Sequence, residues 1–343
     1  MFYKFEDIDA IHLELTSHCN LNCPQCARTH QGATTPHLPL KHLPLATLHK
    51  VFSEMGPQTK YVHLCGNYGD IVAYPQALEA IDLIRSLSPA YIKVYTNASA
   101  RPAEFWRSMG ERLHGDQGQV VFSIDGLADT NSLYRVGSRW EKIMENAKAF
   151  IAAGGNAVWE WLPFEHNDHQ IDQAVTLANE LGFNSIILKK NPRFSPLNNG
   201  AHHTLKPSQV LVHKGIQQVE GMQPTLFPIR CKYQARKMIF IDFEGYLLPC
   251  CWHGNRFKGA GKFNDMHTIM ERYGFDGFDV AKSSVQEILK HPWYVKDMEY
   301  TIKILATCRK HCTLGAKMSN KDNRIVYEFK SHIDREPWED VKL

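Results

Sequence analysis

The stretch that decides the fold is ELTSHCNLNCPQC, at residues 14–26. It overlaps the end of an apolar run, residues 11–15, which predicts a buried β-strand. Cys19, Cys23 and Cys26 therefore follow a strand directly, with the spacing Cys-x3-Cys-x2-Cys. Three thiolates on one loop can ligate three irons of a cubane [4Fe–4S] cluster and leave the fourth iron open.

The alternative for this loop is a structural zinc site. Such a site needs four ligands, usually from two Cys-x2-Cys pairs. The loop offers three cysteines, so zinc would require His18 as its fourth ligand. The spacing favours the cluster.

Outside this loop, short apolar runs alternate with longer amphipathic stretches. The runs predict strands at residues 11–15, 61–64, 91–95, 120–124, 157–162 and 185–188. Three of the intervening stretches predict helices, at residues 75–87, 140–153 and 168–181. Strand–helix units in series predict a parallel sheet with helices outside it. Eight units would close a barrel, so six predict an α/β fold that is a partial (β/α)6 TIM-like barrel.

Composition narrows the classes of protein. The chain has 343 residues, of which 43% are hydrophobic and 22% charged, as in ordinary globular proteins. Its formal charge of +3 is too small to favour nucleic acid or an anionic membrane. No run approaches the roughly 18 apolar residues that span a bilayer, and residues 1–7 do not resemble a signal peptide. We expect a cytoplasmic protein with neither nucleic acid nor membrane as a partner.

The nine cysteines are clustered, which in a reducing compartment favours metal or iron–sulfur ligation over disulfides. Cys65 stands alone, and the second group lies after residue 230. The predicted division is a barrel over residues 1–205, a connecting segment over 206–230, a small cysteine-bearing module over 231–315 and a polar tail over 316–343.

Within this division, local signals predict four further features. They are a helix over residues 208–219, a β-hairpin from 238–242 to 246–249, a helix capped by Ser283 or Ser284 that runs to Lys290, and a partly mobile tail.

The first cysteine motif and its place after strand one resemble those of the radical S-adenosylmethionine (radical SAM) enzymes. In that family the open iron binds the amino and carboxylate groups of SAM, and reductive cleavage yields a 5′-deoxyadenosyl radical that abstracts a substrate hydrogen. The family's fold is the incomplete barrel. The resemblance implies a [4Fe–4S] cluster held by Cys19, Cys23 and Cys26, SAM, and an electron donor such as flavodoxin or ferredoxin.

The resemblance also implies SAM contacts at the ends of later strands. Relatives carry Gly-Gly-Glu after strand two, where this chain has GNYGD at residues 66–70, with Tyr68 in place of Gly and Asp70 in place of Glu. A plain turn is the alternative there, and a surface position is the alternative for Arg135, whose guanidinium would suit the SAM carboxylate. The implied cofactor-binding residues are Gly69, Asp70, Asn97, Ser123, Arg135, Glu165 and Asn167.

The second cysteine group resembles the auxiliary-cluster module called SPASM, or Twitch in its shorter form. Cys231-x13-Gly245-x4-Cys250 matches its first half, and Gly245 permits the hairpin turn. A full SPASM module needs about seven cysteines for its clusters, so the shorter form with one auxiliary [4Fe–4S] cluster is expected. Zinc is the alternative. The implied ligands are Cys231, Cys250, Cys308 and Cys312.

Cys251 directly follows a predicted ligand, at a position where some relatives have an acid that takes a proton from the substrate. A thiol there could return a hydrogen atom to a substrate radical, as epimerisation requires, so Cys251 is the candidate catalytic residue. Structural packing is the alternative for Cys251 and the favoured interpretation for Cys65.

The resemblance implies an enzyme that acts on an unactivated C–H bond. Its substrate is expected to be a peptide, which a RiPP-type maturase would cross-link or epimerise. The alternative is a dehydrogenase or epimerase of a sugar or aminocyclitol, and a non-catalytic iron–sulfur or zinc protein is the alternative from another class. About ten residues precede strand one, so no leader-peptide-binding domain is expected ahead of the barrel. This weakens the peptide hypothesis only slightly, because such domains can also be separate proteins.

Overall fold

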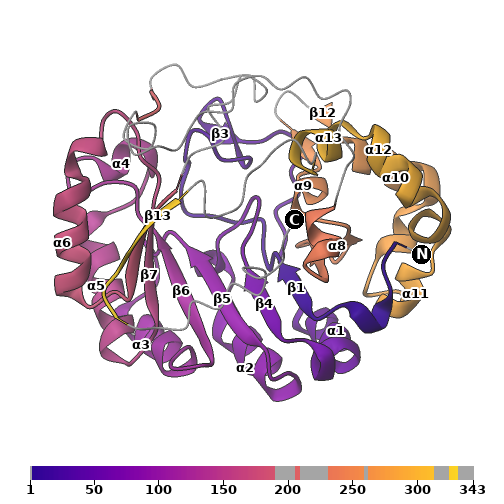
Figure 1. The fold of residues 1–343 in the computed structure, drawn as a ribbon, viewed down its shortest axis with the longest axis horizontal. Helices are drawn as coiled ribbons and strands as arrows, with labels where there is room; N and C mark the ends of the chain where they lie inside the picture. Colours follow the sequence, from indigo (N-terminus) through magenta and orange to yellow (C-terminus); the bar gives the residue numbers. More distant parts are fainter. Residues whose placement is uncertain (1, 190–204, 209–230, 259–261, 313–323, 331–343) are drawn as a thin grey trace.

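The computed structural model describes residues 2–189, 205–208, 231–258, 262–312 and 324–330. Its centre is one nine-stranded sheet (Figure 1). The strand order is β10 (Leu247–Leu248), β9 (Met238–Ile241), β1, β4, β5, β6, β7, β8 and β13 (Arg324–Glu328). Six consecutive strands in this order are parallel, from β1 to β8. They are β1 (Ala10–Leu13), β4 (Tyr61–Leu64), β5 (Tyr91–Thr96), β6 (Gly118–Ser123), β7 (Ala157–Trp161) and β8 (Ser185–Lys189). The predicted α/β fold with six parallel strands is confirmed.

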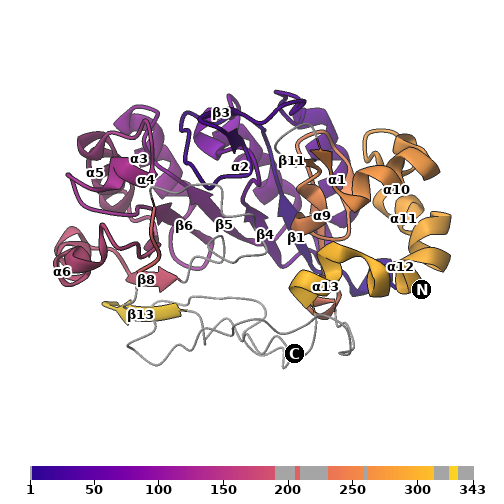
Figure 2. The same cartoon turned by 90° about the horizontal axis from the view of Figure 1, so that it is seen from above.

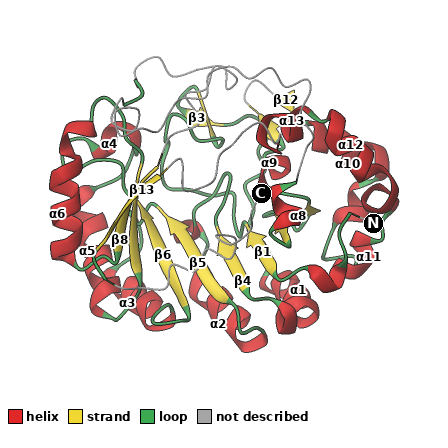
Figure 3. Cartoon of the chain, in the orientation of Figure 1, coloured by secondary structure: helices red, strands yellow, loops and turns green. Residues whose placement is uncertain are grey.

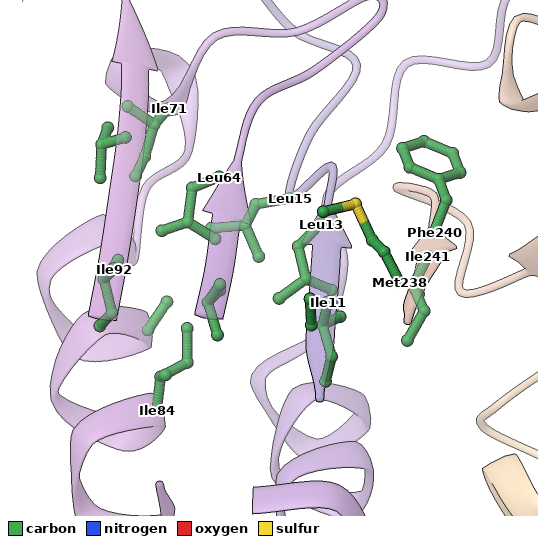
Figure 4. Close-up of a cluster of buried hydrophobic side chains, with 14 of the residues drawn as sticks. Ile11, Leu13, Leu15, Leu64, Ile71, Ile84, Ile92, Met238, Phe240 and Ile241 are labelled. Atoms are coloured by element: carbon green, nitrogen blue, oxygen red, sulfur yellow. The ribbon is translucent and has the colours of Figure 1, made fainter. Parts of the chain in front are cut away.

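Helices cover the outer face of this sheet because each presents an apolar face to it. In α2 (Ala77–Leu87) the buried residues Ala77, Ala80, Ile81 and Ile84 follow the i, i+3, i+4, i+7 spacing of an amphipathic helix. Figure 4 shows Ile84 directed toward the apolar side chains of the strands beside it. The other helices on this face are α1 (Leu45–Met55), α3 (Ala103–Arg112), α5 (Trp140–Ala152) and α6 (Ile171–Leu181).

The predicted hairpin is present and continues the barrel sheet. Its strands are β9 (Met238–Ile241) and β10 (Leu247–Leu248), which pair antiparallel. β9 also pairs in parallel with β1, with Ala10 opposite Met238. Gly245 has a φ of 87°, which L side chains rarely adopt, so the turn depends on glycine. The hairpin that separates Cys231 from Cys250 thus lies beside β1, the strand that leads into the loop of Cys19, Cys23 and Cys26.

The remaining C-terminal helices gather at the β1 end of the sheet, opposite α6 (Figure 2), and Figure 3 shows them as a compact helical group. Ser284 caps α11 as predicted, because its Oγ accepts from the Glu287 amide and the Glu287 carboxylate accepts from the Ser284 amide. The group comprises α8 (Lys232–Ala235), α9 (Cys251–Gly254), α10 (Asp265–Tyr273), α11 (Val285–Leu289), α12 (Met298–Ile304) and α13 (Ala306–Cys312).

One strand of the nine-stranded sheet was not predicted. β13 (Arg324–Glu328) lies in the stretch expected to be a polar tail and pairs antiparallel with β8. The predicted helix over residues 208–219 and most of the connecting segment and tail fall outside the described residues. In the described part of the chain, no helix has the length and apolar character needed to cross a membrane.

Candidate functional site

The first three cysteines lie on the loop that follows β1, at the edge where the parallel strands end. Cys23 is buried, and Cys19 and Cys26 are half-buried. The Cys26 amide donates to the Cys23 carbonyl at 3.0 Å, which closes a turn between them. Burial raises the pKa of Cys19, and the nearby charges of Asp70, Cys26 and Cys23 raise it further. Cys19 and Cys26 pack against the buried cluster that contains Cys23, so the three thiols lie close to one another.

The Cys19 sulfur faces hydrogen-bond donors from two segments. The Leu21 amide lies 3.4 Å from Cys19 Sγ, and Asn97 Nδ2, at the end of β5, lies 3.7 Å from it. The Cys26 thiol itself donates to the Asn67 carbonyl, at 3.9 Å, in the turn after β4. Amide donors such as those of Leu21 and Asn97 stabilise the thiolates of iron–sulfur clusters, so the surroundings of Cys19 fit a cluster held by this loop.

The turn at residues 66–70 packs against the cysteine loop through Gly69. A Cβ on Gly69 would lie 1.8 Å from the Thr16 carbonyl oxygen, so no other residue fits without moving the loop. The Gly69 amide donates to the Glu14 carboxylate at 3.2 Å, and the Tyr68 amide donates to the same oxygen at 2.7 Å. In this structure the backbone amides of Tyr68 and Gly69 therefore both donate to Glu14, a side chain of the protein itself.

Asp70 joins this turn to the end of β5. Its Oδ1 accepts from the Thr96 hydroxyl at 2.7 Å and the Val72 amide at 3.1 Å. Its Oδ2 accepts from the Asn97 amide at 2.7 Å and from Asn97 Nδ2 at 2.8 Å. Four donors thus satisfy the buried carboxylate, and Asp70 orients Asn97 toward Cys19.

Arg135 lies at the same edge. It follows α4 (Asn131–Tyr134), and its Nε donates to Asp125 Oδ2 at 2.6 Å. Asp125 is fully buried, and its other oxygen accepts from the Leu162 amide at 2.6 Å. Within the described residues neither Nη atom of Arg135 has a hydrogen-bond partner, so both remain available for an anion. Ser123 ends β6, half-buried, in register with Glu160 on β7.

Among the described residues, neither Glu165 nor Asn167 contacts the cysteine loop. The Glu165 side chain is 59% exposed, and its carboxylate pairs with Lys206 at 3.2 Å. Asn167 is buried, and its amide bonds the backbone of Phe164, Asp125 and Leu162. Asn167 therefore shapes the loop after β7, which the sequence pattern could not distinguish from a ligand contact.

Glu14 is a buried acid that the sequence analysis did not single out. Burial raises its pKa from 4.5 to about 8, although the amides of Tyr68, Gly69 and Asn67 lower it. Its Oε2 is buried without a hydrogen-bond partner in the described residues. The folded chain thus retains a proton between about pH 4.5 and 8 that the unfolded chain has released. Because the unfolded state binds fewer protons, stability falls as the pH rises through this window.

We predict that Glu14→Gln removes most of this pH dependence, because the amide oxygen can still accept from Tyr68 and Gly69. Urea unfolding of the metal-free chain at pH 5 and pH 8 measures it. The wild type should lose a few kcal/mol relative to the variant, at about 1.4 kcal/mol per pKa unit. Glu104→Gln, at an exposed position, controls for loss of a charge. Parallel pH profiles for wild type and Glu14→Gln would contradict the assignment.

The second cysteine group meets at one cavity. Its lining includes the four predicted ligands, Cys231, Cys250, Cys308 and Cys312, together with Tyr233, Pro249, Trp252, His253, Met298, Ile302 and Thr307. Residues far apart in the sequence thus converge here from α8, α9, α12 and α13. Four thiols around one enclosed, largely apolar cavity fit an iron–sulfur cluster.

Cys251 begins α9, next to Cys250, but has different contacts. Its thiol lies near the Tyr233 hydroxyl, which influences its pKa, and its carbonyl accepts from Asn67 Nδ2 at 2.8 Å. The Tyr233 hydroxyl also lies 2.7 Å from His12 Nδ1, while His12 Nε2 lies 2.6 Å from the Cys65 carbonyl. Burial lowers the pKa of His12 to about 4, so it is neutral at pH 7. Its Nε2 therefore carries the proton toward the carbonyl, and its Nδ1 accepts from Tyr233.

No three His, Cys, Asp or Glu side chains in the described part of the chain are arranged to hold a single metal ion. A [4Fe–4S] cubane does not require this arrangement, because each cysteine ligates a separate iron of the cluster.

No family model and no curated protein matches the sequence. Solved structures do. SuiB of Streptococcus suis, bound to S-adenosylmethionine, has a TM-score of 0.57 and 13% identity over 88% of this chain and 71% of its own. Native anSMEcpe with bound AdoMet has a TM-score of 0.54 and 12% identity over 88% of each chain. Both are radical SAM enzymes. The chain has the radical SAM fold.

SuiB has also been solved with its precursor peptide SuiA, with a TM-score of 0.56 and 12% identity over 87% of this chain and 68% of its own.

In the radical SAM fold of this chain, the residues that the sequence analysis missed are those that support a predicted position. Asn67 contacts Cys26 and Cys251, Asp125 holds Arg135, and His253 lies between two cysteines of the second group. None has a spacing signal, because their partners are distant in the sequence.

Proposed function

We propose that this chain is a radical SAM enzyme that modifies a peptide. The observation that carries the proposal is the three-thiol loop after β1, whose Cys19 sulfur faces the Leu21 amide and Asn97 Nδ2. A [4Fe–4S] cluster bound there by Cys19, Cys23 and Cys26 would supply the reductive cleavage of SAM to a 5′-deoxyadenosyl radical.

The protein's own residues would orient the reactants. Asp70 fixes the Asn97 amide, so the donor toward Cys19 does not reorganise during the reaction. Asp125 holds Arg135 by its Nε, which leaves both Nη atoms for the SAM carboxylate. Arg135 also interacts electrostatically with Cys23, so it lies near the same loop. Ser123, at the end of β6, is the remaining candidate contact at this edge.

A peptide substrate is supported by what the similar structures contain. SuiB was solved bound to a precursor peptide, and anSMEcpe was solved with AdoMet and a peptide. The four-thiol cavity beside α9 would hold the auxiliary cluster, as the Twitch resemblance implies. A peptide bound between the two cysteine groups would meet the radical on one side and Cys251 on the other.

The substrate class is tested by supplying the reconstituted enzyme, SAM and a reductant with short peptides encoded beside its gene. We expect 5′-deoxyadenosine formation to rise with one peptide, and that peptide to lose two hydrogens or to gain a D-residue. Mass spectrometry and chiral amino-acid analysis measure these changes. An unchanged peptide, with consumption of a sugar or aminocyclitol instead, would overturn the peptide proposal and leave the radical chemistry standing.

Cys251 is the proposed hydrogen-atom donor. Its link to Asn67, whose carbonyl contacts Cys26, supports a position between the two cysteine groups. In the proposed step a substrate carbon radical takes the hydrogen of the thiol, so a C–H bond forms, the S–H bond breaks and a thiyl radical remains. The thiyl needs one electron and one proton to return to the thiol. The reduced auxiliary cluster is the proposed electron source, and water supplies the proton.

We predict that Cys251→Ala still forms 5′-deoxyadenosine but makes no epimerised product. In deuterated water the wild type should place one solvent deuterium on the product carbon, because the thiol proton exchanges. Mass spectrometry of the product measures this. Cys65→Ala, the other cysteine outside the two predicted ligand sets, should keep full product yield. Full turnover by Cys251→Ala, with no solvent deuterium, would return Cys251 to a packing role.

A further inference from the structure

His253 lies between two sulfurs of the second cysteine group. Its Nδ1 is 3.5 Å from Cys250 Sγ, and its Nε2 is 3.7 Å from Cys308 Sγ. The side chain is 1% exposed and lines the four-thiol cavity. It is the histidine among the lining residues of that cavity, and no sequence motif singled it out.

Hydrogen bonds on both sides hold the backbone of His253 in place. The His253 amide donates to the Cys250 carbonyl at 3.1 Å within α9, and the His253 carbonyl accepts from Asn264 Nδ2 at 2.9 Å. Asn264 also caps α10 through its side chain, so it is itself held in place. The His253 backbone is therefore held from both sides, and its ring lies buried in the cavity with one nitrogen near each sulfur.

The chemistry of the ring is asymmetric. A neutral imidazole has one N–H and one lone pair, and a metal-bound thiolate can only accept hydrogen bonds. If Nδ1–H donates to the Cys250 sulfur, the Nε2 lone pair faces the position of Cys308. In metal-binding histidines, one ring nitrogen usually donates its N–H to an acceptor while the other ring nitrogen ligates the metal.

We propose that His253 is a fifth donor of the auxiliary site and can ligate, through Nε2, the iron that Cys308 otherwise holds. This inference rests on the proposed auxiliary cluster. The site would then accept two ligand sets, four thiolates or three thiolates and an imidazole. An imidazole is neutral where a thiolate is negative, so the second set has the higher reduction potential.

Cys312 provides a matched comparison, because it shares α13 with Cys308 and lines the same cavity. In the described part of the chain its sulfur has no hydrogen bond to His253, whereas that of Cys308 does. The proposal therefore predicts different outcomes for two chemically identical substitutions on one short helix.

The test reconstitutes wild type, Cys308→Ala, Cys312→Ala and the double variant Cys308→Ala/His253→Ala under anaerobic conditions. Cys308→Ala should retain about eight irons per chain, with an auxiliary potential above that of the wild type. Pulsed EPR of the Cys308→Ala protein with ¹⁵N-labelled histidine should show a nitrogen coupling to the reduced cluster. Cys312→Ala leaves three thiolates with no imidazole beside the fourth iron, so it should show no nitrogen coupling, and the double variant should show none either.

The outcomes separate this inference from the proposal on which it rests. If Cys308→Ala shows no ¹⁵N coupling, or a coupling no different from that of Cys312→Ala, His253 is not a donor and the inference is wrong. If the wild type itself binds only about four irons, the auxiliary cluster is absent and the proposed function fails at that point. Circular dichroism of each metal-free chain identifies a variant that fails to fold, and His253→Gln then replaces His253→Ala.

Discussion

Replacing Cys19, Cys23 or Cys26 singly with alanine is expected to abolish 5′-deoxyadenosine formation and to leave the second cluster in place. Each thiolate holds one iron, and the two that remain rarely retain a cubane with an open iron. The loss should be complete within detection, and roughly half of the iron should stay with the chain. Chromatography of the nucleoside products and iron analysis measure the two effects.

The matched control is Cys65→Ala, because Cys65 lies on the turn after β4, outside both predicted ligand sets. It should keep both the iron and the SAM cleavage. Normal deoxyadenosine yield from any variant of the three-cysteine loop would refute the assignment of these ligands.

Changing Cys308 and Cys312 together to alanine is expected to remove the second cluster and to leave SAM cleavage in place. Both thiols line the cavity that also contains Cys231 and Cys250, and loss of two ligands should remove the auxiliary cluster. Roughly half of the iron should be lost, product formation should stop, and SAM cleavage uncoupled from product should continue. Iron analysis, deoxyadenosine yield and product yield on the same sample measure the three effects.

The single variant Cys308→Ala is the informative comparison for this pair, since His253 Nε2 lies 3.7 Å from the Cys308 sulfur. Unchanged iron in the double variant, or an unchanged product yield, would show that the cavity does not hold a functional cluster. Loss of SAM cleavage as well would show that the two cysteine groups are not independent.

The elements predicted from the sequence are those that depend on local pattern. The six barrel strands and the helix over 75–87 are present within two residues, because apolar periodicity and buried faces coincide. The pairing of β9 with β1 and of β13 with β8 was not predicted, since a sheet partner far along the chain leaves no mark on the local pattern. The strand at 324–328 is short and partly exposed, so it resembles a polar tail.

For the candidate site too, the sequence predicted the local features but not the contacts between distant segments. The cysteine spacing predicted which thiols share a loop, and the structure brings the four cysteines of the second group to one cavity. Spacing could not show that Asp70 is saturated by Thr96, Val72 and Asn97, or that Glu165 pairs with Lys206 at the surface. These partners belong to other elements, and only the fold brings them together.

The central claim is that two separate cysteine groups of this chain hold two iron–sulfur clusters, the first of which cleaves SAM. The most direct measurement is iron content and 5′-deoxyadenosine release by the anaerobically reconstituted wild-type chain with SAM and a low-potential reductant. We predict about eight irons per chain, as two cubanes, and deoxyadenosine that forms only when the reductant is present. Zinc in place of iron, with no cleavage of SAM, would contradict the claim.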